Sequence, residues 1–201
     1  MKVTNILLIW ALFCFSNFAQ ADENRAPFLQ KGTRLVGGSF TFSSAGNTYY
    51  ENSDGDRTQE WIVRPGGGYF VADKLALDLH VEGRWFIQGD VRSSHYSMGP
   101  TLQYYFDTVG EDEPKGHAVP YLGLGYLWGL AREDRSDSEA KFNSGMWSMS
   151  AGITWMLSDL IGLDLEFNYQ TGEFTEKIPV DGVARDANRI SFFVGVKAFL
   201  P

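Results

Sequence analysis

The feature that most constrains the fold is a strict alternation of two kinds of residue along residues 74–86. Large apolar residues share one parity: Leu75, Leu77, Leu79, Val81 and Trp85. Polar and charged residues share the other: Asp78, His80, Glu82 and Arg84. Because strand side chains point to opposite faces with a period of two, this segment predicts one long strand with an apolar wall and a charged wall. Ordinary strands have about five or six residues and a tilted membrane-crossing strand about 9 to 11, so this segment is long enough to cross a bilayer.

The first 21 residues have the organisation of a secretory signal peptide. Lys2 precedes an apolar run at residues 6–15, and a small-x-small site ending at Ala21 precedes Asp22. This layout predicts export and cleavage after Ala21. The run is too short for a transmembrane helix, and no later segment has the roughly 18 to 20 apolar residues that such a helix needs. Cys14 is the single cysteine and lies in the signal peptide, so the mature chain is expected to carry no thiol or disulfide.

The mature chain is expected to form one all-β domain. About 180 residues fit a single domain, and 22 glycines with 15% aromatic residues suit a chain with many turns. Eight segments carry the alternation: residues 34–43, 57–70, 74–86, 91–106, 117–130, 141–157, 160–172 and 187–200. The expected division is a signal peptide (1–21), a short polar periplasmic lead (22–33) and an outer-membrane β-barrel domain (34–201).

The connections between these segments alternate in length. Polar loops are expected at residues 44–56, 131–140 and 173–186, and tight turns at residues 71–73 and 158–159. An even number of long antiparallel strands, with short turns at one end and longer loops at the other, is typical of outer-membrane barrels. The chain is therefore predicted to be an eight-stranded antiparallel up-and-down transmembrane β-barrel with both termini in the periplasm. Two connections fit this pattern less well, since residues 107–116 are long for a periplasmic turn and residues 88–90 are short for an outer loop.

Alternation alone also fits a soluble periplasmic carrier of the lipocalin kind, whose apolar face points inward. Two properties of the polar parity favour a membrane barrel. It holds glycines that would make room for large side chains opposite: Gly66, Gly68, Gly99, Gly123, Gly125, Gly152, Gly162 and Gly195. It also balances its charges, as a buried lumen requires: Arg64, Arg84, Arg189 and Lys197 against Asp78, Glu82, Asp164 and Glu166.

The apolar parity places aromatic residues near both ends of the strands. The group toward the loops comprises Trp61, Trp85, Trp128, Trp147 and Tyr169. The group toward the turns comprises Tyr69, Tyr104, Phe106 and Trp155. Two aromatic girdles at the lipid interfaces are expected of a membrane barrel. Pro65, Pro100 and Pro120 each remove a ladder hydrogen bond, so they are expected at bulges or near strand ends.

Three segments carry a resemblance to a known family: GYFVADKLAL at residues 68–77, GPTLQYYF at 99–106 and PYLGLGY at 120–126. Their turn and strand patterns resemble the bacterial outer-membrane protein β-barrel domain family, which includes opacity-type surface proteins and the barrels of OmpA-like porins. The resemblance covers about residues 34–200. It implies an eight-stranded barrel that is inserted by the barrel-insertion machinery and serves as an adhesin, an anchor or a structural protein.

Candidate chemical sites are weak, and no catalytic, cofactor or metal site is predicted. His95 and Ser97 resemble the His-x-Ser of outer-membrane lipid A deacylases, but their parity directs them into the lumen and no Glu follows on the same strand. A lipid A-modifying enzyme stays open as an alternative. Residues 52–56 resemble the front of a calcium loop without its closing Glu, and His80, His95 and His117 lack metal-ligand spacing. A lumen of eight strands is expected to be filled by a salt-bridged plug rather than to conduct.

The charge distribution indicates which partners the barrel could have. A net charge of -8 argues against nucleic acid. Basic residues nevertheless gather at the expected extracellular rim: Arg57, Arg92, Arg132, Arg135, Lys141, Lys177 and Arg185. Guanidinium groups suit phosphate oxygens, so these residues are predicted to contact lipopolysaccharide, although nearby acidic residues fit ordinary charged loops equally well. The expected function is that of a monomeric, non-enzymatic surface or adhesion-type protein that acts through its loops.

Overall fold

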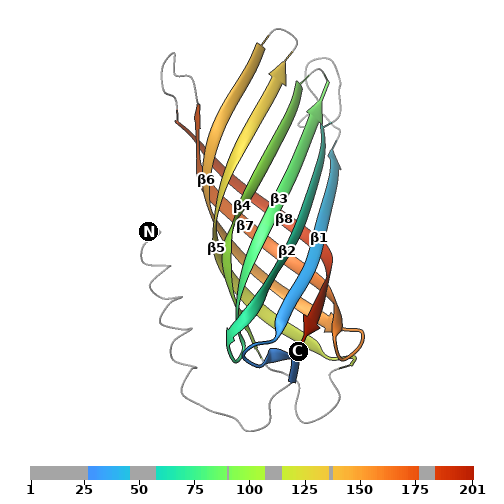
Figure 1. Cartoon of the computed structure of the whole chain (residues 1–201). Helices are drawn as coiled ribbons and strands as arrows, with labels where there is room; N and C mark the ends of the chain where they lie inside the picture. Colours follow the sequence, from blue (N-terminus) through green and yellow to red (C-terminus); the bar gives the residue numbers. More distant parts are fainter. Residues whose placement is uncertain (1–26, 46–57, 90, 107–114, 136–137, 177–183) are drawn as a thin grey trace, which may run out of the picture.

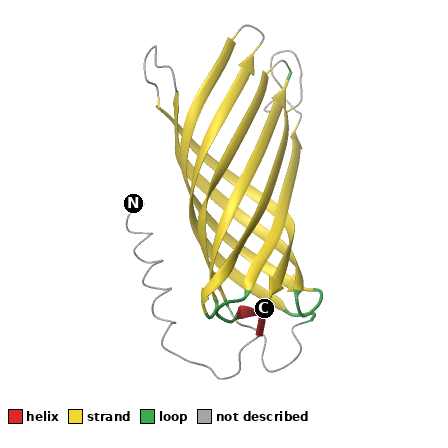
Figure 2. Ribbon diagram, in the orientation of Figure 1, coloured by secondary structure: helices red, strands yellow, loops and turns green. Residues whose placement is uncertain are grey.

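The computed structural model describes residues 27–45, 58–89, 91–106, 115–135, 138–176 and 184–201. Eight strands follow a short 3-10 helix in these residues: η1 (Pro27–Leu29), β1 (Arg34–Ala45), β2 (Thr58–Ala72), β3 (Leu75–Gln88), β4 (Val91–Tyr105), β5 (Ala118–Arg135), β6 (Ser138–Met156), β7 (Ile161–Glu176) and β8 (Ala184–Leu200). Each strand pairs antiparallel with the next, and β1 pairs antiparallel with β8, so the sheet closes (Figure 1, Figure 2). The predicted eight-stranded antiparallel barrel is confirmed. Among the described residues, no helix combines the length and apolar character needed to traverse a bilayer.

The two predicted faces of the sheet are also confirmed. On β3, Leu79 is 54% exposed on the outside of the barrel, whereas Glu82 is fully buried in the lumen. The same parity holds on the other strands, so the apolar wall points outward and the inverted, carrier-like barrel does not form. Exposed tryptophans lie toward both ends of this outer surface, as expected for girdles: Trp61, Trp85, Trp128 and Trp147 at one end and Trp155 at the other.

Two ends of the barrel are distinguished by their connections. At the turn end, β2 passes to β3 through Asp73 and Lys74, and Lys74 adopts a positive φ of 66°. The opposite end, where β1 leads to β2, β3 to β4, β5 to β6 and β7 to β8, is called the loop end. There the β3–β4 connection is as short as the sequence indicates, with Gly89 at φ 56°. Residues 46–57 and 107–114 lie outside the described part of the chain.

The predicted charged loop at residues 131–140 is wrong. Strand β5 continues to Arg135 and β6 starts at Ser138, and register pairs such as Arg132 with Lys141 run through this region. The β5–β6 hairpin consequently rises furthest at the upper end of Figure 1. Part of the predicted loop at residues 173–186 is likewise strand, because β7 reaches Glu176 and β8 begins at Ala184. The parts of both segments that form strand lack an apolar face, so their sequence predicts a loop. In the structure they are strand because each pairs with the neighbouring strand of its hairpin.

The strand prolines are accommodated in two ways. Pro65 keeps its register partner on β1, while the ladder to β3 is interrupted and resumes in the same register. Pro100 likewise keeps its partner on β3 and interrupts the ladder to β5 without a shift. The expectation of bulges or strand ends is therefore wrong for these two prolines, because a closed barrel tolerates a missing N–H bond on one side of a strand. Pro120 does lie near a strand end, as the third residue of β5.

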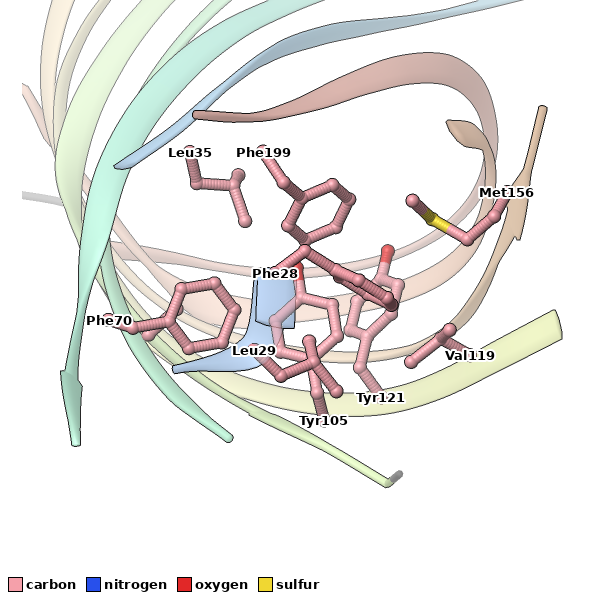
Figure 3. Packing of buried hydrophobic residues seen from close by; sticks show 10 residues of the cluster. Phe28, Leu29, Leu35, Phe70, Tyr105, Val119, Tyr121, Met156 and Phe199 are labelled. Carbon is pink, nitrogen blue, oxygen red and sulfur yellow. The ribbon is translucent and has the colours of Figure 1, made fainter. Parts of the chain in front are cut away.

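The turn end is closed from inside by an apolar cluster that the sequence did not indicate. Phe28 and Leu29 of η1 are buried in the barrel mouth, and the Lys74 backbone N–H donates to the Leu29 carbonyl at 2.8 Å. Figure 3 shows both side chains among aromatic residues of the barrel wall. The cluster comprises Phe28, Leu29, Leu35, Phe70, Ala76, Tyr105, Val119, Tyr121, Met156 and Phe199. Phe28 and Leu29, within the expected polar lead, thus form an inner plug.

Candidate functional site: the lumen and the outer rim

The centre of the lumen holds a guanidinium between two carboxylates. Arg64 of β2 donates from Nη2 to Glu82 of β3 at 3.1 Å and from Nη1 to Glu166 of β7 at 2.5 Å. All three side chains are buried. The same guanidinium lies 3.8 Å from the centroid of the Phe193 ring. A buried charge is tolerated only when it is paired and hydrogen-bonded, and Arg64 meets both conditions.

Glu82 extends this network to β8. Its Oε1 accepts a hydrogen bond from Arg189 at 2.5 Å, and its Oε2 accepts one from Gln170 at 3.1 Å. Arg189 also donates to the Gln170 amide oxygen at 2.6 Å. Glu82 therefore receives bonds from three different strands, and its charge ties together opposite walls of the barrel.

A second ion pair lies nearer the turn end. Lys197 Nζ is 3.0 Å from Asp164 Oδ1, and it also lies 3.6 Å from the centroid of the Tyr121 ring. The Tyr121 hydroxyl is within 3.0 Å of both Asp164 and Glu166, and Thr154 donates to Asp164 at 2.8 Å. This layer connects the central ion pairs to the apolar cluster below. The charge balance predicted for the polar parity is therefore realised in part: Arg64, Arg189 and Lys197 form direct ion pairs, whereas the buried Asp78 carboxylate has no hydrogen-bond partner among the residues that the structure describes.

The inward glycines make room for these side chains, as predicted. A β-carbon added at Gly152 would meet the Tyr121 ring, and one added at Gly66 would meet His80. A β-carbon at Gly123 would meet the Ser150 hydroxyl. The interior of an eight-stranded barrel is only wide enough for the side chains that fill it. A residue with a β-carbon at any of these three positions would collide with a neighbouring side chain, so glycine is needed there.

Little open space is left in this part of the lumen. A cavity of about 30 Å³ lies beside the ion pairs, lined by Asp78, His80 and Lys197 among others. A cavity of this size holds about two water molecules. The salt-bridged plug that the sequence predicts is therefore confirmed for the described residues.

His95 and Ser97 point into the lumen and are buried, as their parity predicts. His95 Nε2 lies 2.7 Å from Ser144 Oγ of β6, whereas the Ser97 hydroxyl two residues along has no hydrogen-bond partner in the described part of the chain. His80 lies on β3 with its Nδ1 3.4 Å from Thr101 Oγ1 of β4, and His117 precedes β5. The described residues contain no group of three His, Cys, Asp or Glu that could hold a metal ion. The structure thus separates the histidines and directs His95 away from the lipid-facing wall.

The predicted basic rim is only partly within the described structure. Arg92, Arg132 and Lys141 are exposed and lie at the loop end of β4, β5 and β6. Their positions share the outward parity, and Arg132 is the register partner of both Ser94 and Lys141. The structure therefore brings these three residues onto one outer face. Arg135 and Arg185 occupy strand positions whose side chains are not described, and Arg57 and Lys177 lie outside the described residues.

The outer wall below these three residues is hollowed on both sides of Trp128. One hollow of about 530 Å³ is lined by apolar side chains that include Tyr96, Met98 and Leu130. The other, of about 470 Å³, lies toward β7 and includes Trp147 and Glu173 in its lining. Tyr126 separates Trp128 from Trp147, and its ring centroid is 5.0 Å from each of theirs. Aromatic side chains bound both depressions, and the absence of a side chain at the outward-facing Gly145 deepens the one toward β7.

Comparisons with known proteins show which solved structures have a similar fold. No protein-family model and no curated protein matches the chain. Among solved structures, it is similar to Neisserial surface protein A, with a TM-score of 0.55, 19% identity and coverage of 83% of this chain and 96% of that one. The N-terminal β-barrel domain of OprF from Pseudomonas aeruginosa gives a TM-score of 0.55 and 13% identity over 89% of this chain and 100% of that one. The outer membrane protein OprG from Pseudomonas aeruginosa gives a TM-score of 0.52 and 15% identity over 86% of this chain and 98% of that one.

The chain has the eight-stranded outer-membrane β-barrel fold. This barrel spans almost the whole length of each of these solved structures. At these identities the likeness concerns the fold, so the lumen and the rim must be interpreted from this chain's own residues.

Two features of this barrel were missed by reasoning from sequence. The plug at Phe28 and Leu29 was read as part of a polar lead, although two adjacent apolar residues shortly before the first strand are a usable signal. The hollows beside Trp128 had no sequence signal, because they depend on which residues of β4, β5 and β6 stand side by side in the closed sheet.

Proposed function

We propose that the protein is an integral outer-membrane barrel with a closed lumen, which acts at the cell surface as a structural or adhesion-type protein through its loop end. The observation that carries this proposal is the filled interior combined with an apolar exterior. A solute would have to displace the buried ion pairs of Glu82 and then the apolar cluster around Leu29. Both chain termini belong to the turn end in this proposal, which would lie in the periplasm.

The same proposal gives the loop end a lipid contact. Arg132 and Lys141 lie on the outer face in the cross-strand row that contains Trp85, and Arg92 lies one row nearer the loop end. Lipopolysaccharide phosphates lie at that level of an outer membrane, and charge-assisted bonds from guanidinium and ammonium groups are among the strongest in proteins. We expect these residues to stabilise the barrel in a lipopolysaccharide-containing membrane.

The location and the closed lumen can be tested together. Membrane fractions run on SDS gels with and without boiling should show the protein in the outer membrane, with a mobility shift that appears only on boiling. The refolded protein in a planar lipid bilayer should give no steady conductance above that of the lipid. A soluble periplasmic protein without a shift would contradict the membrane location, and a stable ohmic conductance would contradict the closed lumen.

The proposed contact with lipopolysaccharide can be tested by removing positive charges at the loop end and, as a control, at the turn end. Arg132→Gln combined with Lys141→Gln should lower the stability of the barrel in lipopolysaccharide more than in neutral detergent. Lys115→Gln is the matched control, because Lys115 is an exposed cation just before β5 at the turn end. Equal effects of the double variant in both media would remove the proposed contact.

A further inference from the structure

The outer wall between β3 and β6 changes from apolar to cationic over three successive cross-strand rows. The first row contains Val81, Met98 and Trp128. The second contains Tyr96, Leu130 and Asn143. The third contains Trp85 and Ser94, followed by the cations Arg132 and Lys141. All of these positions have the outward parity, so one molecule lying along the strands would contact each row in turn.

The apolar hollow lies across the first two rows. Its volume of about 530 Å³ is that of a small-molecule site. Tyr96 and Trp128 form exposed walls, and the inward-facing positions Ser97, Gly129 and Ser144 place the strands themselves at its floor. A depression bounded by large aromatic side chains holds a flexible apolar chain better than a flat wall does, because more of the chain's surface is covered.

The spacing between the hollow and the cations is a few ångströms larger than the thickness of a headgroup layer. Arg132 follows Trp128 by four residues, which corresponds to about 13 Å along a strand. With a strand tilt of about 40°, the rise along the membrane normal is about 10 Å. The polar layer on each side of a bilayer is about 5 to 7 Å thick, so cations at phosphate level would place Trp128 about 3 to 5 Å inside the hydrocarbon, where an acyl chain lies.

We propose that this face binds one lipopolysaccharide molecule through its lipid A, with a phosphate on Arg132 and Lys141 and an acyl chain in the hollow beside Trp128. The proposal rests on the outer-membrane location and deepens the rim contact given above. Lipid A combines phosphate groups with several acyl chains, which is the combination that the three rows match. The hollow on the β7 side is excluded as the acyl site, because Glu173 in its lining would repel the same phosphates.

Methionine methyl groups give a direct readout of this site. Met98 lines the hollow, whereas Met149 has the same outward parity on β6 and does not line it. We would titrate the refolded barrel in neutral micelles with lipid A and follow both ¹³C-methyl resonances, which are assigned by substitution with leucine. The Met98 signal should shift saturably while the Met149 signal stays in place. Equal shifts of both signals would overturn the specific site.

Matched tryptophan variants test the hollow itself. Trp128 and Trp155 are similarly exposed, at 56% and 54%, but lie at opposite ends of the outer surface. Trp128→Ala should weaken lipid A binding by about fivefold to tenfold, which is the effect of losing one partly buried aromatic contact. Trp155→Ala should leave the affinity unchanged. Equal effects of the two substitutions, or no effect of either, would overturn the proposed acyl site.

Two further ligands separate this inference from the contact on which it rests. A deacylated, bisphosphorylated glucosamine disaccharide should lose binding in Arg132→Gln/Lys141→Gln but not in Trp128→Ala. If the charge variant matters and Trp128→Ala does not, the rim contact stands and the acyl site fails. If the charge variant binds both ligands like the wild type, the phosphate contact fails. Equal binding of dimyristoyl phosphatidylglycerol would overturn the choice of lipid A as the occupant.

Discussion

Replacing Glu82 by Met should reveal how much of the barrel's stability depends on the central ion pairs. Glu82 is fully buried and accepts bonds from Arg64, Arg189 and Gln170. Methionine has nearly the same shape, so the change removes the charge without opening a large cavity. Arg64 would keep Glu166 as a partner, whereas Arg189 would keep only the Gln170 amide oxygen.

The magnitude follows from the charge that is left behind. Removing one partner of a buried ion pair costs about 3 to 5 kcal/mol, because the remaining charge is uncompensated in a low-dielectric site. We therefore expect the free energy of unfolding to fall by about that amount in Glu82→Met. Adding Arg189→Met should restore part of the loss, because the uncompensated guanidinium is then gone.

Urea unfolding of the refolded barrel in phospholipid vesicles, followed by tryptophan fluorescence, measures this effect. Glu60→Met is the matched control, because Glu60 pairs with Arg84 on the same two strands. This pair is partly exposed to solvent, with side-chain exposures of 21% for Glu60 and 30% for Arg84. A partly exposed pair contributes about 1 kcal/mol or less, so the control should change little. Equal losses in the two variants, or no recovery in the double variant, would refute the proposed role of the buried pairs.

Three further changes test the wall, the lumen and the plug. Leu79→Arg on the outer wall should destabilise the inserted barrel by about 2 to 4 kcal/mol, whereas His80→Gln next to it should change little; equal tolerance in vesicle-unfolding measurements would reverse the two faces. Gly152→Val should destabilise by about 1 to 3 kcal/mol through overpacking, whereas Gly38→Val has room for its β-carbon; similar urea midpoints for both would contradict the need for an inward glycine. Leu29→Ala should cost about 2 to 5 kcal/mol and speed amide exchange at the turn end, and unchanged exchange there would argue against the plug.

The sequence alone determined the class of fold and the two faces of the wall. Alternation with a period of two decides which residues share a face, and each strand carries that information locally. Glu82 and Arg64 could therefore be assigned to the lumen, and Leu79 and Trp128 to the outside, before their neighbours were known. Both assignments hold in the structure. Strand ends were less predictable. The charged residues near 131–140 are cross-strand neighbours in the ladder beyond the apolar band, and they carry no apolar face that would predict a strand.

The tertiary structure alone decided which residues meet. Ion pairs such as Arg64 with Glu166 join residues 102 positions apart, and their geometry depends on the stagger with which all eight strands close. The same stagger places Met98 beside Trp128 and sets Arg132 next to Lys141. Parity is a property of a single strand, whereas contacts across a closed sheet depend on the register of every strand between them, which no single segment encodes.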